Sequence, residues 1–152
     1  RLALMETGLA GRALDYYHVI CPAAKEDVID TYRCEPYVYS QMIAGKEAPT
    51  PGEAKNAWLT GTAAWSFLVV SQGFCGIQPD YEGLRLDPSL PADWPSISVT
   101  RKFRGATYQI KLENPDGRTR GIRELHVNGQ PVAGNLIPLA ERGSTVQVTA
   151  TL

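Results

Sequence analysis

The run Thr60-Gly61-Thr62 stands directly before an apolar segment, Ala63 to Val70, in which Ser66 is the single polar residue. That segment is too short to span a bilayer, so it predicts a buried helix that begins at the threonines. A helix start carries unpaired backbone N–H groups, glycine lets an anion come close to them, and a threonine hydroxyl adds a donor. Thr60-Gly61 is therefore a candidate oxyanion site, with phosphate as the favoured anion. Capping of the helix by Thr60 or Thr62 is the commoner role for such residues, and it stays open.

Two further polar residues, Glu35 and Gln41, lie in a largely apolar run that extends from Cys34 to Gly45. Pro36 suits the first turn of a helix and Gly45 suits its C-terminal cap, so this run predicts a second, largely buried helix. A buried glutamate needs a partner, and a buried glutamine amide needs several hydrogen bonds. Each of the two side chains could therefore tie a loop in place or face a ligand cavity.

Other residues of types that often take part in catalysis or binding are interpreted as structural. His18 lies near the end of a helical pattern and suits a cap or a packing position, and His126 alternates with apolar neighbours in a strand pattern. Trp58 and Trp65 are seven residues apart on similar helix faces, which predicts core packing rather than a platform for sugars. We find no Ser-His-Asp set, P-loop, GxGxxG or metal-ligand cluster in the sequence.

Composition limits the classes of function. The 152-residue chain has 43% hydrophobic residues and a formal net charge of -1, which predicts a soluble folded protein of one domain or two small ones. Without a long basic run or a long apolar segment, nothing favours binding to nucleic acid or to a membrane. Cys21, Cys34 and Cys75 form no CxxC pair and predict reduced thiols in a cytoplasmic protein. The start at Arg1, inside a helical pattern, suggests that the chain is a fragment.

The periodicity changes once along the chain. Apolar residues at helical spacing from Leu2 predict an amphipathic helix that ends near Ile20, followed by a loop with a helical turn over 23–33. After the two helices described above, which end near Gly45 and between Gly73 and Gly76, alternation with period two begins. Strands are predicted over 83–87, 97–103, 106–112, 124–132, 136–139 and 145–150, with turns at Arg104-Gly105 and Asn128-Gly129. Such short, regular strands predict an antiparallel sandwich or barrel.

Four blocks of the sequence resemble the cellobiose phosphorylase family, the inverting disaccharide phosphorylases of glycoside hydrolase family 94. The blocks are Glu35–Gly45, Gly52–Trp65, Gly76–Pro88 and Val99–Tyr108, and their order and spacing also agree with the family. The resemblance covers nearly the whole chain. Four blocks in the right order are far more specific than any one of them.

The resemblance implies an α+β fold. Residues 1–78 would be the last helices of an incomplete (α/α)6 catalytic barrel, and residues 79–152 a C-terminal, jelly-roll-like antiparallel β-sandwich. The family cleaves a β-glucoside such as cellobiose with inorganic phosphate, giving α-glucose 1-phosphate and glucose. A general-acid aspartate, expected upstream of this chain, protonates the glycosidic oxygen while phosphate attacks the opposite face.

The resemblance also assigns site residues and partners. A glutamine and a threonine-glycine pair of the family's phosphate site fall on Gln41, Thr60 and Gly61, whereas Glu35 has only a supporting role. The implied partners are a β-linked saccharide and phosphate, with no cofactor or metal, in a homodimer of the full-length protein. Cellodextrin, chitobiose and β-1,2-glucan phosphorylases and cyclic β-1,2-glucan synthase are alternatives within the family. The non-enzymatic alternative is a carbohydrate-binding or assembly module, with Phe103 and Tyr108 as the candidate sugar contacts.

Overall fold

The computed structural model describes residue 5 and residues 7–152, and the chain is α+β with two compact units. The β unit comprises Arg1–Ala13 and Val69–Leu152, and the N-terminal unit comprises Leu14–Leu68. Each unit has its own cluster of buried side chains.

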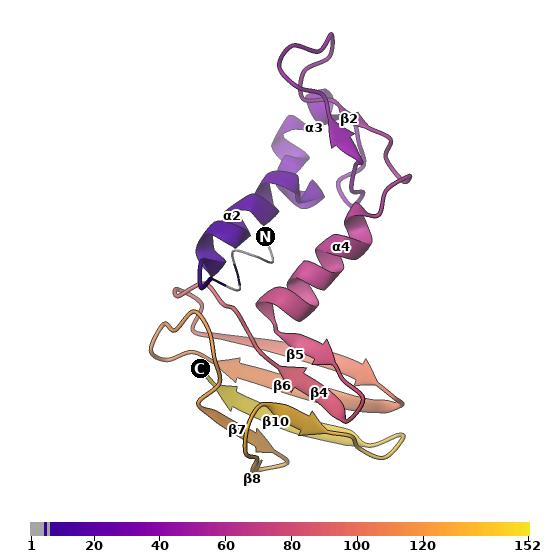
Figure 1. Cartoon of the computed structure of the whole chain (residues 1–152). Coiled ribbons are helices and arrows are strands. Elements are labelled where there is room, and N and C mark those ends of the chain that lie inside the picture. Colours follow the sequence, from indigo (N-terminus) through magenta and orange to yellow (C-terminus); the bar gives the residue numbers. More distant parts are fainter. Residues whose placement is uncertain (1–4, 6) are drawn as a thin grey trace. The chain divides into compact units, whose positions relative to one another are not determined.

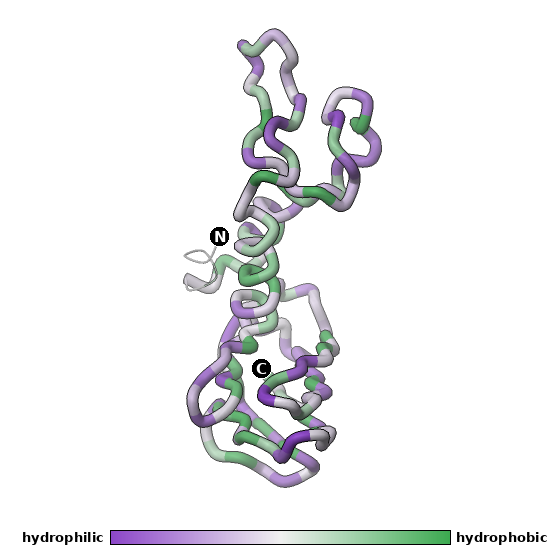
Figure 2. Tube along the Cα trace, turned by 90° about the vertical axis from the view of Figure 1, so that its right-hand side faces the viewer, coloured by the Kyte–Doolittle hydropathy of each residue, from purple (hydrophilic) through white to green (hydrophobic). Residues whose placement is uncertain are grey.

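Two sheets form the β unit (Figure 1). The larger sheet has the strand order β5-β6-β10-β7-β8, and the smaller has the order β3-β4-β9. Along β5, β6 and β10 more buried and more exposed residues alternate. Figure 2 shows hydrophobic and hydrophilic residues following one another along the chain. The strands are β3 (Ile77–Pro79), β4 (Gly83–Leu86), β5 (Ser96–Phe103), β6 (Ala106–Glu113), β7 (Glu124–Val127), β8 (Gln130–Pro131), β9 (Leu136–Pro138) and β10 (Thr145–Thr151).

One hydrophobic core is shared by the two sheets of the β unit. It takes alternate residues from β6 and β10 in the larger sheet and from β4 and β9 in the smaller one. Tyr108 is fully buried there, where its hydroxyl donates to the Pro138 carbonyl at 3.3 Å and accepts the Ala140 N–H at 3.1 Å. Tyr108 is therefore unable to contact a saccharide, which corrects the interpretation that the sequence left open for it.

The two predicted tight turns are confirmed. Arg104 and Gly105 have φ values of 49° and 90° and join the paired residues Phe103 and Ala106, so β5 and β6 form a two-residue hairpin. Asn128 and Gly129, with φ values of 50° and 78°, join β7 to β8 in the same way. Positive φ at both central residues is what the type I′ hairpin turn requires.

The expectation of a purely antiparallel module is wrong at one strand pair. β10 lies between β6 and β7, antiparallel to β7 but parallel to β6 over seven residue pairs. Alternation along a strand reports which face is buried, and it is the same for either direction of the neighbouring strand. The direction is set by the chain path between Glu113 and Thr145, which the pattern does not encode.

The N-terminal unit begins within α2 (Ala10–Ile20), which ends where the sequence predicts. Gly8, with φ 76°, precedes this helix, and the predicted positions Leu2 and Leu4 lie outside the described residues. After α2 the unit contains a 3-10 helix η1 (Pro22–Val28), α3 (Ile29–Tyr32), the paired strands β1 (Met42–Ile43) and β2 (Ala54–Lys55), and α4 (Thr62–Leu68). Along the chain, α4 continues into the π-helix η2 (Val69–Phe74), so the predicted central helix and its end are confirmed. Its expected burial is wrong, because Ala63 to Trp65, Phe67 and Val70 are exposed.

The helix predicted over Cys34–Gly45 is wrong. Arg33, in the left-handed region at φ 54°, ends α3, and the following segment is irregular until β1. Tyr32, Cys34 and Val38 form a small buried cluster, and the Tyr32 hydroxyl lies 3.2 Å from Ser40 Oγ. Burial of these side chains and pairing with β2 fix this segment, and both are tertiary interactions that override local helix propensity.

The expectation that Trp58 and Trp65 are core residues is also wrong. Their exposed fractions are 66% and 63%, and Leu59 and Phe67 nearby are 76% and 59% exposed. Ser66 is instead the buried residue of α4. The helix therefore presents its apolar side chains outward.

We expect the isolated 152-residue chain to self-associate, because large apolar side chains such as Trp58, Leu59, Trp65 and Phe67 are exposed and association would bury them. Sedimentation velocity over a range of concentrations should show species larger than the monomer. A Trp65→Lys, Phe67→Lys double variant should shift the distribution toward monomer, since both side chains are exposed and their replacement leaves buried residues untouched. A wild-type chain that stays monomeric at every concentration would contradict this prediction.

Candidate functional site

Gln41 is positioned by the pairing of β1 with β2. Its backbone N–H donates to the Lys55 carbonyl at 3.2 Å, which extends the ladder by one residue beyond Met42. Its exposed side chain meets Asn56, the residue that follows β2, and Asn56 Nδ2 donates to Gln41 Oε1 at 2.8 Å. The side-chain oxygen of Gln41, Oε1, thus accepts a hydrogen bond from Asn56, which leaves the two Nε2 hydrogens of the side chain to donate to a ligand.

Thr60 caps α4. Its Oγ1 accepts the backbone N–H of Thr62 at 3.0 Å and lies 2.7 Å from the Thr62 hydroxyl, while the Gly61 carbonyl accepts the Trp65 N–H at 3.0 Å. The capping role that the sequence left open is therefore present. Capping leaves the Thr60 hydroxyl hydrogen available for another acceptor, because in the contact between the two hydroxyls Thr62 can be the donor.

Gln41 and Thr62, the first residue of α4, line a common hollow of about 290 Å³. The hollow is lined by Ile20, by the run Ser40 to Ile43, which includes Gln41, and by Thr62. Among the described residues, Thr60 and Gly61 do not line this hollow. The structure thus brings Gln41 together with Thr62, and Thr62 in turn bonds to Thr60.

Glu35 is exposed rather than buried, and it holds a neighbouring aromatic side chain. Trp58 Nε1 donates to Glu35 Oε1 at 3.3 Å, and the Cys34 thiol lies 3.7 Å from Oε2. The backbone N–H of Glu35 and the Trp58 indole lower the pKa of the carboxyl, because both donate to its charged form. Trp58 has φ 69°, and its ring and that of Tyr37 pack in a T-shaped arrangement with centroids 6.2 Å apart. Glu35 therefore supports the loop before Thr60.

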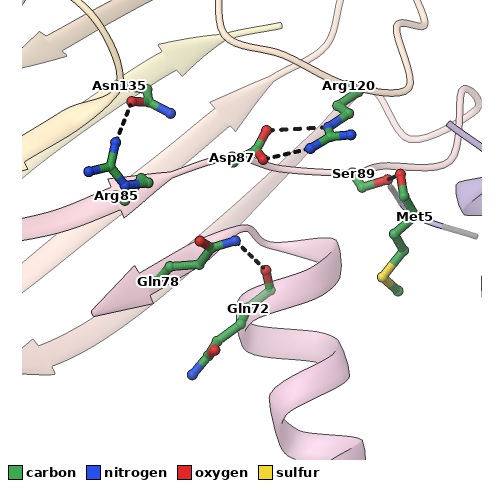
Figure 3. A network of polar contacts seen from close by, with 8 residues as sticks. All are labelled: Met5, Gln72, Gln78, Arg85, Asp87, Ser89, Arg120 and Asn135. Atoms are coloured by element: carbon green, nitrogen blue, oxygen red, sulfur yellow. Dashed lines mark hydrogen bonds and ion pairs between the residues drawn. The ribbon is translucent and has the colours of Figure 1, made fainter. Parts of the chain in front are cut away.

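A separate polar network lies in the β unit (Figure 3). Asp87 forms an ion pair with Arg120 at 2.9 Å, and Arg85 donates to Asn135 at 3.4 Å. Ser89 Oγ donates to the Met5 carbonyl at 3.1 Å, which ties the start of the chain to the segment after β4. The hydrogen bonds and the ion pair drawn in this view all join residues of the β unit, so the network has a structural role.

The remaining groups with possible chemistry are few. Cys34 and Cys75 are buried free thiols, and burial raises the pKa of each. Cys21 is half-buried. Over residue 5 and residues 7–152 there is no group of three or more side chains suited to a metal ion, and no helix is long and apolar enough to cross a membrane.

Comparison with known proteins assigns the chain to a family. Residues 2–76 match the catalytic domain of the glycosyl hydrolase 94 superfamily. The chain belongs to this family. The match contains all three residues of the candidate phosphate site, Gln41, Thr60 and Gly61.

Several relatives of this glycosyl hydrolase 94 chain are phosphorylases. The N,N'-diacetylchitobiose phosphorylases of Vibrio proteolyticus and Vibrio furnissii are 39% and 36% identical over 99% of the chain, which covers 19% of each relative. The solabiose phosphorylase of Paenibacillus borealis is 36% identical over 91% of the chain, which covers 18% of that protein. The chain thus spans about a fifth of the length of these relatives.

Asn56 is the hydrogen-bond partner of Gln41 that the sequence did not indicate. Its contact with Gln41 depends on the β1–β2 pairing, which replaces the helix expected there. The signal available in the sequence was weak. An asparagine directly before Ala57-Trp58 suits a turn or a left-handed position, and nothing in that pattern names its partner.

Proposed function

We propose that the full-length protein is an inverting disaccharide phosphorylase. It cleaves a β-linked disaccharide with inorganic phosphate and releases an α-sugar 1-phosphate and the shorter sugar. The observation that carries this proposal is the family match over residues 2–76, supported by relatives that are phosphorylases. Phosphate replaces the activated water of an inverting hydrolase, so one carboxylic acid suffices for the chemistry. We place that general-acid aspartate in a part of the protein outside this chain.

Within the chain, the proposed phosphate site consists of Gln41, Thr60 and Gly61. Gln41 Nε2, the Thr60 hydroxyl and the Gly61 backbone N–H would each donate to a phosphate oxygen. The local geometry of Gly61 supports this role. Its φ is not positive, and a Cβ there would meet only Trp65 Cδ1 at 3.8 Å, so neither strain nor crowding calls for glycine. Close approach of an anion to the backbone does call for it.

The proposed domain organisation follows the family. Residues 1–78 would be the last helices of an (α/α)6 catalytic barrel and residues 79–152 a jelly-roll-like β-sandwich. The family match over residues 2–76 supports the first of these ranges. In the structure, Cys75 and Ile77 already belong to the core of the β unit, so its compact part begins before residue 79. The proposal further includes a homodimer in the cytoplasm that works without a cofactor. The three free thiols accord with a reducing compartment.

The substrate has two candidates, and both are β-linked disaccharides. Cellobiose follows from the sequence blocks, and N,N'-diacetylchitobiose is favoured by the two relatives that align with 99% of the chain. The test is to incubate the full-length protein with each disaccharide and with phosphate, and to quantify sugar 1-phosphate. We expect turnover of one donor to exceed that of the other at equal concentration. Absence of product from these and other β-linked disaccharides would refute the proposed function.

A further inference from the structure

We propose that Asn56 is a positioning residue that turns the Gln41 amide so that its N–H groups face the phosphate. This inference rests on the proposed phosphate site and adds a residue to it. Its basis is the single 2.8 Å hydrogen bond in which Asn56 Nδ2 donates to Gln41 Oε1.

The chemistry of the amide makes its orientation matter. Oxygens of phosphate near neutral pH mainly accept hydrogen bonds, so a glutamine amide attracts phosphate with Nε2 and repels it with Oε1. The two ends differ little in size, and sterics alone would leave both orientations populated. While Asn56 Nδ2 faces Oε1, a turn of the Gln41 amide alone would set one N–H group against another and lose the hydrogen bond, so the contact favours the orientation with Nε2 outward.

The backbone holds Asn56 at this position. Asn56 directly follows β2 and has φ 53°, in the left-handed region where asparagine is among the best-tolerated residues other than glycine. β2 pairs with β1 in the register Met42↔Lys55, and the Gln41 N–H bonds to Lys55. Gln41 and Asn56 therefore extend from adjacent ends of one antiparallel pair.

Stability gives little reason for this bond. Both side chains are exposed, so water can replace either partner, and such a hydrogen bond contributes little to folding. Loss of the Asn56 side chain should consequently change phosphate recognition more than it changes thermal stability.

The test uses two variants of the full-length protein. Asn56→Gly removes the donor and still tolerates the positive φ, whereas Asn56→Asp keeps the shape and replaces the donor with an acceptor. We expect the KM for phosphate to rise about 3- to 10-fold in Asn56→Gly, as for loss of one modest hydrogen bond, and further in Asn56→Asp. In the Asp variant the amide turns round, because the carboxylate can only accept. The KM for the disaccharide, kcat at saturating phosphate and the thermal midpoint should stay near their wild-type values.

A double-mutant cycle with Gln41→Ala separates the possible outcomes. If Asn56 acts through Gln41, Asn56→Gly should have no further effect on the phosphate KM in the Gln41→Ala background. An equal effect in both backgrounds, or no effect of Asn56→Gly, would overturn the inference and leave the phosphate site standing. A phosphate KM at the wild-type value in Gln41→Ala would overturn both the role of Asn56 and the place of Gln41 in the phosphate site. A phosphate KM that is unchanged in Asn56→Asp would show that the hydrogen bond runs in the opposite direction, which also contradicts the proposal.

Discussion

Replacing Gly76 with alanine is expected to prevent the β unit from reaching its native fold. Gly76 has φ 64°, and a Cβ at this position would lie 2.1 Å from the Asp87 carbonyl carbon and 2.2 Å from Pro88 N. Both atoms belong to the backbone, in the segment where Asp87 N–H bonds to the Gly76 carbonyl at 2.9 Å. No side-chain rotation relieves such a clash, so the strand β4 would have to move away from the core.

The expected cost for Gly76→Ala is more than about 4 kcal/mol, which is among the largest values seen for single substitutions. Gly134→Ala is the matched control, because Gly134 has φ 79° but nothing lies within 4 Å of the added Cβ. That control should cost only the left-handed strain, about 1–2 kcal/mol. Thermal unfolding of both variants in the full-length protein measures the difference. Similar midpoints for the two would contradict the close approach at Gly76.

Thr60→Val is expected to weaken phosphate binding strongly in the full-length protein. Valine keeps the shape of threonine and loses the hydroxyl, so it removes one charge-assisted hydrogen bond of about 1.5–3 kcal/mol, or roughly 10- to 150-fold in the phosphate KM. It also removes the cap that bonds the Thr62 N–H, which should cost about 1 kcal/mol of stability.

Thr60→Ser is the control that separates binding from capping. Serine restores both the hydroxyl and the cap, so its phosphate KM should return close to the wild-type value. The measurement is initial rate against phosphate concentration at saturating disaccharide. If Thr60→Val raises the KM for the disaccharide instead, Thr60 acts on the sugar or on the fold, and its role in the phosphate site is wrong.

The sequence predicted those parts of the fold that local chemistry determines. Strands with a strict period of two and turns with Arg104-Gly105 and Asn128-Gly129 are confirmed, because alternation and positive φ are local properties. The parallel alignment of β10 with β6 was missed, since strand direction depends on the path of the intervening chain. The helix expected over Cys34–Gly45 failed for a similar reason, because burial of Val38 and pairing of β1 are tertiary.

In the candidate site, too, local contacts could be predicted from the sequence and long-range contacts could not. Capping at Thr60 could be predicted, because it joins residues two apart in the sequence. The contact between Gln41 and Asn56 could not, because fifteen residues separate them and the register of β1 with β2 brings them together. The exposure of Trp58 and Trp65 could not be predicted either. An apolar side chain is expected to be buried, but its type alone does not show whether another segment packs against it.

The central claim is phosphorolysis with inversion, and the product tests it most directly. The full-length protein would be incubated with N,N'-diacetylchitobiose or cellobiose, with and without phosphate, and the early products followed by ¹H and ³¹P NMR. We predict that an α-sugar 1-phosphate appears as the first product and that the disaccharide stays intact when phosphate is omitted. Release of two free sugars at the same rate without phosphate, or a β-sugar 1-phosphate as the first product, would contradict the account.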